Sequence, residues 1–179
     1  MSAIQTQVPA GTWTLDPVHS LVGFEVGYLA GTFRGQFSDV RVDLTVDGDR
    51  ARIEGTAKVA SVDVKDENLA AHLQSPDFFD AERYPELRFV AEDVDLDGTS
   101  VVVPGEITIK GVTKQVEVNG TLADPISDPY GNERLGLELS TRIDRTEFGI
   151  EWNMPLPTGD PALSNEVTIV AELQLVKAA

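Results

Sequence analysis

The chain has 179 residues, the length of a single domain, and its 14 Lys and Arg against 30 Asp and Glu give a net charge of -16 at pH 7. This charge repels phosphate backbones and anionic lipid headgroups, and no local basic patch offsets it, so nucleic-acid binding is not expected. Cysteine is absent, which excludes a redox pair, a thiol nucleophile and a thiolate metal site.

The N-terminal residues 1–16 contain neither a basic start nor an apolar run, so they do not have the pattern of a signal peptide. No segment approaches the ~20 apolar residues that a membrane-spanning helix needs. We therefore expect a cytoplasmic protein without stable membrane insertion. We assign residues 1–10 to a flexible N-terminal segment and residues 11–177 to one β-barrel domain.

Apolar and polar residues alternate with a period of two over most of the chain, which is typical of strands with one buried face. Val22, Phe24 and Val26, for example, alternate with small or charged residues. The segments with this pattern are 22–28, 40–46, 53–59, 87–96, 101–109, 116–122, 135–143 and 167–175. These eight strands and their short turns predict an all-β, mainly antiparallel fold, either a barrel or a sandwich.

Turn residues and prolines divide these strands. Asp47-Gly48-Asp49 and Asp97-Gly98 each predict a hairpin. Pro104 falls inside a predicted strand and removes a ladder donor, so we expect it at an edge, an end or a bulge. Residues 123–132 and 153–165 form two long loops, which are either functional lids or plain connections.

Residues 65–89 hold the one convincing helix signal of the chain. Leu69, His72 and Leu73 are spaced i, i+3 and i+4 and share one face of a short helix, which Ser75-Pro76-Asp77 ends. A dense group of aromatic residues follows, namely Phe78, Phe79, Tyr84 and Phe89. We expect the helix and these aromatic residues to close one end of the sheet.

Small residues occupy inward positions of several predicted strands. Gly55, Ala57, Gly105, Gly120 and Ala171 share the alternation phase of the large aliphatic residues around them. An eight-stranded barrel is filled by side chains or, where these are small, holds one small ligand. Glycines also mark bulges and bends, so both interpretations stay open at each position, but the five together favour a cavity.

Catalytic and metal-binding patterns are weak. His19 and His72 are the only imidazoles, and Ser20, Ser61 or Ser75 would need one of them as a base. Nothing matches a nucleophile elbow or an HExxH pair, and Asp16 with His19 is more typical of a self-capping turn. We predict no catalytic residue, no metal and no cofactor. An enzyme that acts on an apolar substrate, hydrolase-like or isomerase-like, with His19 or His72 as base stays the alternative.

Five sequence blocks are similar, in the same order, to those of a known family. They are WTLDPVHS at 13–20 with Phe24, GTFRGQF at 31–37, HLQSPDFFD at 72–80 with Tyr84, Pro85 and Phe89, GEITIKGVTK at 105–114, and DRTEFG at 144–149 with Trp152 and Asn153. Together they span nearly the whole chain and resemble the YceI-like family of lipocalin-like, polyisoprenoid-binding proteins. The resemblance implies an antiparallel barrel with a helix near one opening and no enzymatic activity.

The resemblance also implies a ligand, a long isoprenoid chain such as a polyprenol or a quinone tail, for which the protein acts as carrier, store or sensor. A chain without hydrogen-bonding groups needs little more than a long dry tube. As residues of the lumen and mouth we predict Phe24, Phe33, Phe37, Leu73, His72, Phe78, Phe79, Phe89, Ile107, Phe148, Trp152 and Met154. As polar residues of the mouth we predict His19, His72, Arg145 and Asn153.

Two alternatives to this assignment stay open. The aromatic residues could be plain core, and the barrel a filled one that serves as a stress-related interaction module. A homodimer is also left open. The helix departs from the family pattern, because Leu69, Ala70 and Gln74 stand where relatives often carry Arg, Asp and Arg. We therefore expect the segment to grip an apolar chain by shape and to leave the headgroup weakly specified.

Overall fold

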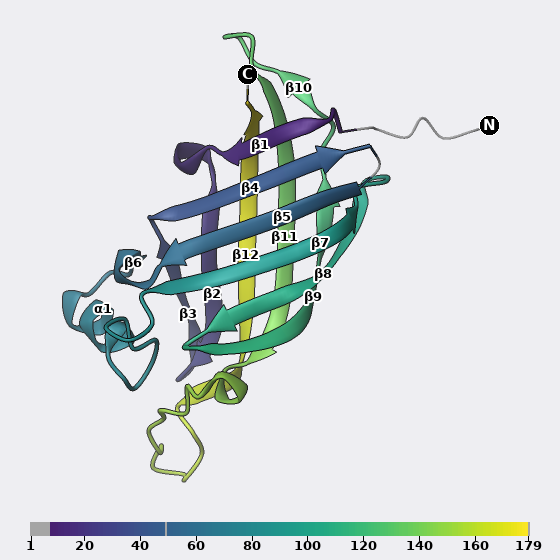
Figure 1. Ribbon diagram of the computed structural model, residues 1–179. Helices are drawn as coiled ribbons and strands as arrows, with labels where there is room; N and C mark the ends of the chain where they lie inside the picture. The colour runs from purple at the N-terminus through teal and green to yellow at the C-terminus, as the bar shows by residue number, and fades with distance from the viewer. Residues whose placement is uncertain (1–7, 49, 179) are drawn as a thin grey trace.

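The strands form one antiparallel sheet that curls around a lumen (Figure 1). The computed structural model describes residues 8–48 and 50–178. The strands in that part are β1 Gly11–Leu15, β2 Leu21–Tyr28, β3 Gly31–Phe37, β4 Val40–Asp47, β5 Arg50–Lys58, β6 Val62–Asp63, β7 Glu86–Asp95, β8 Ser100–Ile109, β9 Val112–Leu122, β10 Ile126–Ser127, β11 Glu133–Asp144 and β12 Leu163–Lys177. The helices are α1 Glu67–Gln74 and the short 3-10 helices η1 Pro17–His19, η2 Val59–Ser61 and η3 Arg145–Phe148.

Eight of these strands close a ring in the order β1, β4, β5, β7, β8, β9, β11 and β12. The long strand β12 closes it, because it pairs with β11 from Arg134↔Val176 to Asp144↔Glu166 and with β1 at its C-terminal end. Lower down, β12 pairs instead with β2, which continues the sheet to β3 and β6. The predicted all-β, eight-stranded barrel with one short helix is confirmed.

The barrel is narrow at one end and wide at the other. Strands β9 and β11 pair only from Leu137↔Leu122 to Ser140↔Asn119, and beyond this point they separate. In Figure 1, β4, β5, β7 and β8 cross in front of β2, β11 and β12. Helix α1 lies at the left of this arrangement, and the loop after η3 lies below it. The helix and this loop cover the wide end.

Two clusters of buried side chains divide the interior. The first fills the narrow end around Trp13 and Leu44, both 0% exposed, and the indole Nε1 of Trp13 donates to the carbonyl of Pro9. The second lies at the wide end around Phe37, Leu73 and Phe148. The packed end anchors the barrel, since such apolar burial is the main source of its stability.

All eight predicted strands are present. The alternation did not indicate β1 and β3, nor the two-residue strands β6 and β10. Strand β1 has five residues, of which only Trp13 is fully buried. Strand β3 contains two glycines, and one of them, Gly35, has the ring of Phe24 over it, so that an added Cβ would lie 2.6 Å from Phe24 Cζ. Short length and glycine hide the period-two signal in both strands.

The predicted turns join the expected strands. β4 pairs with β5 and β7 with β8, as the two hairpins required, although Asp49 lies outside the described residues. Pro104 lies in the middle of β8 and not at an end, where it pairs with Glu117 of β9; the β7–β8 pairing covers only residues 106–108 of β8, so Pro104 falls outside it. The predicted flexible segment 1–10 falls mostly outside the described residues and stays a prediction.

Both long loops carry short ordered elements. Residues 123–132 contain β10, which pairs with β11, and residues 153–165 contain an isolated bridge between Pro155 and Pro161 and the first residues of β12. Among the residues that the structure describes, no helix combines the length and the hydropathy of a membrane span.

An apolar cavity as candidate ligand-binding site

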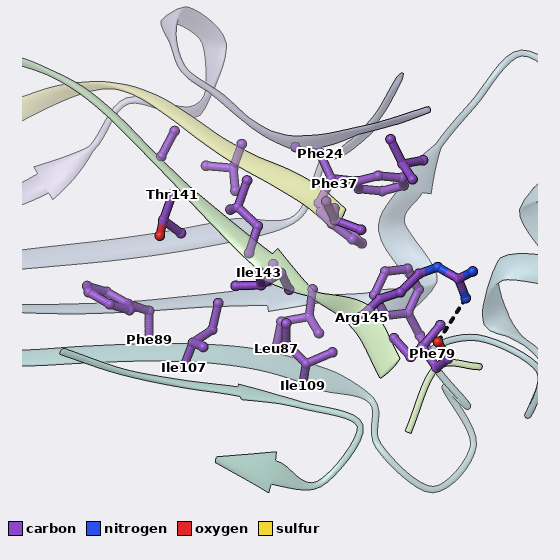
Figure 2. Close-up of a pocket in the computed structure, with 18 of the residues that line it drawn as sticks. Phe24, Phe37, Phe79, Leu87, Phe89, Ile107, Ile109, Thr141, Ile143 and Arg145 are labelled. Atoms are coloured by element: carbon purple, nitrogen blue, oxygen red, sulfur yellow. Dashed lines mark hydrogen bonds between the residues drawn. The ribbon is translucent and has the colours of Figure 1, made fainter. Parts of the chain in front are cut away.

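A cavity of about 590 Å³ occupies the wide end of the barrel between the two walls of the sheet. Figure 2 shows Phe24 and Phe37 on one side and Phe89, Ile107 and Ile109 on the other. Most of the lining side chains are aliphatic or aromatic. They come from β2, β3, β4, β5, β7, β8, β9, β11 and β12, from α1 and the segment after it, and from η3 and the segment after it. The volume lies within the range of ordinary small-molecule sites, which are also mostly apolar.

Two groups of aromatic rings form the part of the cavity near the helix. Phe24 contacts Phe33, Phe37 and Phe79, with ring centroids 6.0, 6.0 and 6.1 Å apart. In the second group, His72 meets Phe78 and Trp152 edge-on, each at 4.9 Å between centroids. Tilted and edge-on contacts are favourable arrangements of aromatic rings, so both groups are well packed.

Helix α1 presents its predicted face to this cavity. It begins because the carboxylate of Asp66 accepts a hydrogen bond from the backbone N–H of Leu69 at 3.0 Å. It ends where the Ser75 hydroxyl donates to the carbonyl of His72. Leu69, His72 and Leu73 all line the cavity, and Leu73 is buried. The i, i+3, i+4 spacing therefore placed this stripe correctly.

His72 is the polar group of the helix that faces the cavity. Its Nε2 lies 3.0 Å from Oδ2 of Asp77, and about a third of its side chain is exposed. The predicted stop of the helix at Ser75-Pro76-Asp77 thus also supplies the partner of the imidazole.

Lys110 lies in the turn between β8 and β9. Its Nζ donates to the carbonyls of Pro76 and Gly149 and so connects this turn with the segment after α1 and with the end of η3.

Arg145 borders the cavity but is fully engaged with the backbone around it. Its Nε donates to the Ser164 carbonyl at 2.8 Å, and its Nη1 donates to the carbonyls of Ile150 and Trp152. Its Nη2 donates to the Leu163 carbonyl and to Oδ1 of Asn165. A guanidinium has five N–H donors, so these contacts use all of them. Burial lowers the pKa of Arg145 below its ordinary value. The dashed line in Figure 2 marks one of these bonds.

Three of the predicted residues do not line the cavity. Phe148 is 1% exposed and packs in the core cluster beside it. Asn153 holds the loop base to β12, since its Nδ2 donates to the Leu163 carbonyl at 2.7 Å and its Oδ1 accepts from the Leu163 N–H. His19 lies on η1, where its Nδ1 is 2.7 Å from Oδ2 of Asp16. The self-capping turn expected for Asp16 and His19 is present, because Asp16 also accepts from the N–H of Val18.

Asp16 belongs to a charged network outside the cavity. Arg134 donates to Asp16 through Nη1 and to Asp128 through Nε, both at 2.8 Å. The Arg134 hydrogen bond, followed by that of His19, holds the pKa of Asp16 well below its ordinary value. The Arg134 hydrogen bond also lowers the pKa of Asp128 to about 2. This network fastens the loop that contains β10 to the strand end before η1.

The other predicted lining residues surround the cavity: Phe24, Phe33, Phe37, His72, Leu73, Phe78, Phe79, Phe89, Ile107, Arg145, Trp152 and Met154. The prediction omitted many aliphatic residues of the same walls, such as Leu87, Ile109, Ile143, Val167 and Ile169. Several of them share the alternation phase of the aromatic residues on their strands, so the period-two pattern was the signal that could have found them.

Three of the five small inward residues leave the space expected of them, and two do not. Gly55, Ala57 and Ala171 line the cavity. Gly105 lies under the ring of Phe89, where an added Cβ would be 2.7 Å from Cζ, and a Cβ on Gly120 would overlap the backbone of Glu138. These two glycines permit close approach of neighbouring groups, which differs both from the expected space and from the bulges and bends that were the alternative. In the described part of the chain, no group of three or more His, Asp or Glu could hold a metal ion.

The fold and the cavity define the class of protein, a closed antiparallel β-barrel with an apolar internal cavity beside a short helix. The family model of the YceI-like domain matches residues 13–175 of this chain. The chain belongs to the YceI-like family.

Similar proteins occur in several bacteria. The UPF0312 protein plu2095 of Photorhabdus laumondii is 34% identical over 140 residues, which are 76% of this chain and 73% of that protein. A UPF0312 protein of Pseudomonas fluorescens is 32% identical and covers 96% of this chain and 90% of its own length. Protein YceI of Escherichia coli is 29% identical over 89% of this chain and 82% of its own.

Solved structures share the fold at lower identity. BcnA of Burkholderia cenocepacia superposes with a TM-score of 0.74 at 24% identity, and it covers 89% of this chain and 98% of its own. A polyisoprenoid binding domain from Saccharophagus degradans superposes with a TM-score of 0.72 at 13% identity, over 93% of this chain and 98% of its own. These likenesses show that the barrel is the common fold.

Proposed function

We propose that the cavity binds a long, uncharged, isoprenoid-type molecule, such as a polyprenol or a quinone tail, and that the protein is its carrier or store. The observation that carries this proposal is the apolar cavity of about 590 Å³, walled by aliphatic and aromatic side chains. A sensor that reports the same ligand would need the same cavity. The filled barrel considered as an alternative disagrees with this open volume.

The charges around the cavity favour a ligand without a carboxylate or phosphate. Two guanidinium groups border it, Arg88 and Arg145. Arg88 donates through Nη2 to the Glu54 carboxylate at 2.8 Å, and all five donors of Arg145 are used by the protein itself. A fatty acid would have to bury its carboxylate without a dedicated cation, which is strongly unfavourable. An alcohol or a quinone makes no such demand.

The energy of binding comes from removing the chain from water. Each buried methylene-sized group contributes about 0.8 kcal/mol, so a five-carbon isoprene unit contributes about 4 kcal/mol before the cost of ordering the chain. The phenyl rings of Phe24, Phe33, Phe37 and Phe79 offer a continuous apolar wall to branched methyl groups. The structural neighbour from Saccharophagus degradans is described as a polyisoprenoid binding domain, which supports the same class of ligand.

The imidazoles favour binding without turnover. His19 lies outside the cavity lining and pairs with Asp16. His72 lines the cavity, but the hydroxyl of the neighbouring Ser75 donates to the backbone carbonyl of His72 and not to its ring. The hydrogen bond from nucleophile to base that activates a serine is therefore not formed at Ser75.

Organic extraction of the protein, purified without detergent, tests the proposal. We expect a long-chain neutral isoprenoid in the extract, identified by mass spectrometry, at close to one molecule per chain. The extract should lose this species when the cavity is narrowed by Ala171→Leu, while Val102→Leu, on the exposed face of β8, should keep it. An extract without stoichiometric lipid, from a protein that also takes up no polyprenol or quinone in vitro, would reject the proposal.

A further inference from the structure

Two exposed apolar side chains, Leu29 and Met154, belong to adjoining segments beside the cavity. Met154 lines the cavity and is 49% exposed, and Leu29, in the turn between β2 and β3, is 61% exposed. The backbone connects them, since the Leu29 N–H donates to the Ala162 carbonyl and the Ala162 N–H donates to the Met154 carbonyl. We call Leu29 and Met154, together with the segments 26–33 and 152–164 that carry them, the mouth patch.

Leu29 occupies a backbone position that does not suit leucine. Its φ is +53°, in the left-handed region that Gly and Asn adopt more readily than a bulky residue. Its side chain is also largely in water. Both features are unfavourable for the isolated protein, and no packing compensates for the exposed part of the side chain. Backbone strain of this kind is concentrated at functional sites, so the exposed Leu29 side chain is a candidate for contact with a partner.

The mouth patch is nearly free of charge in a strongly acidic chain. Residues 26–33 contain no charged residue, and residues 152–164 contain only Asp160, whereas a quarter of the whole chain is charged. The flanking charges are Glu25, which pairs with Arg34, and Glu151 and Glu166, of which Glu166 pairs with Arg142. A partner with charged groups would find little to pair with here, and an anionic one would meet the net charge of -16.

We infer that the mouth patch docks onto an uncharged lipid surface, with Leu29 and Met154 inserted among the lipids, so that ligand passes between membrane and cavity without crossing water. This inference rests on the proposed isoprenoid ligand. Each isoprene unit lowers the concentration of free ligand in water by roughly several hundred fold, so exchange through water becomes very slow for long chains. Direct contact between the opening and a bilayer removes that barrier.

Flotation with phosphatidylcholine vesicles tests the docking. The wild-type protein should float with these vesicles and less with vesicles that contain equal amounts of phosphatidylcholine and phosphatidylglycerol. The L29N and M154Q variants should each lower vesicle partition by about tenfold, the effect of withdrawing one apolar side chain. Val102 on β8 is 51% exposed and lies outside the cavity lining, so V102N is the matched control and should float like the wild type.

Two further measurements separate docking from a structural role of Leu29. Because asparagine tolerates positive φ, L29N should melt at or above the wild-type temperature while it binds vesicles less well. Brominated phosphatidylcholine should quench the fluorescence of Trp152, two residues before Met154 in the same loop, and leave the fully buried Trp13 unquenched. A melting temperature that falls together with vesicle binding would overturn the assignment of Leu29 as an anchor.

Other results would also reject the docking. The docking is rejected if the wild-type protein does not float with the vesicles, or if L29N and M154Q float as well as the wild type and V102N. A dimer in sedimentation that L29N and M154Q convert to a monomer would make the patch an interface between two copies. The proposed function has its own readout, uptake of a detergent-solubilised polyprenol. Flotation without uptake of polyprenol would reject the proposed ligand but not the docking. Uptake without flotation would reject the docking but not the proposed ligand.

Discussion

Replacing Gly55 with leucine should fill part of the cavity without moving the barrel. Gly55 lies in β5, lines the cavity and does not have a positive φ. A Cβ built on it lies 3.6 Å from Cγ2 of Val42 and 3.7 Å from the carbonyl oxygen of Arg41, both ordinary van der Waals distances. The other carbons of the leucine then extend into open volume.

The structure sets the size of the effect. Four added carbon groups, each the size of a water molecule at ~30 Å³, remove about 120 Å³ of the cavity of about 590 Å³. Glycine inside a strand costs about 0.5–1 kcal/mol and burial of leucine contributes about 1.5–3 kcal/mol, less up to about 1 kcal/mol of side-chain entropy. Stability should rise by about 2 kcal/mol, which for a chain of this length raises Tm by about 4–8 °C.

Two assays on Gly55→Leu should move in opposite directions. Thermal unfolding should shift upward, while the affinity for a long isoprenoid should fall at least about tenfold, since an isoprene unit loses its place. Gly120→Ala is the contrasting control, because its Cβ would overlap the Glu138 backbone outside the cavity and should lower Tm. Gly55→Leu with a lowered Tm and unchanged isoprenoid affinity would refute the reasoning.

Three other substitutions probe the supports of the site. Arg145→Met removes the donors to the buried carbonyls of Ile150, Trp152 and Leu163 and should lower the free energy of unfolding in urea by about 3–5 kcal/mol. A loss under about 1 kcal/mol would contradict a stabilising role of these hydrogen bonds. Because Arg134 lowers the pKa values of Asp16 and Asp128, the stability they contribute is full above their ordinary value of 3.8 and lost as pH falls. Arg134→Gln should thus lower Tm at pH 7 and match the wild type near pH 1. Asp77→Asn should change stability by under about 1 kcal/mol, since the Asp77 side chain is more than half exposed; a larger change in urea unfolding would show that its pair with His72 stabilises the fold.

The alternation of residues predicted the fold because most strands bury one face. It failed at β1 and β3, where Trp13 and Phe37 are buried but the strands are short or contain glycine. Their burial depends on residues far along the chain, such as Lys177 and Leu44 opposite Trp13. A local pattern does not contain that pairing, so the closure of the ring through β1 and β12 could not be read from it.

The site was predictable to the extent that it depends on side-chain direction. The stripe of Leu69, His72 and Leu73 follows from helical spacing and faces the cavity. The role of Arg145 does not follow from spacing, because its acceptors are carbonyls between 150 and 164 that only the folded loop brings together. The same holds for Gly105 and Gly120, whose neighbours across the sheet decide between space and close packing.

Native mass spectrometry with isoprenoid alcohols of increasing chain length tests the central claim most directly. The wild-type protein should form an adduct of one alcohol per chain, with an affinity that rises with chain length until the cavity of about 590 Å³ is full. Gly55→Leu should reach that limit at a shorter chain. Absence of any adduct with the folded wild-type protein, or an identical limit in both proteins, would contradict an isoprenoid site inside the barrel.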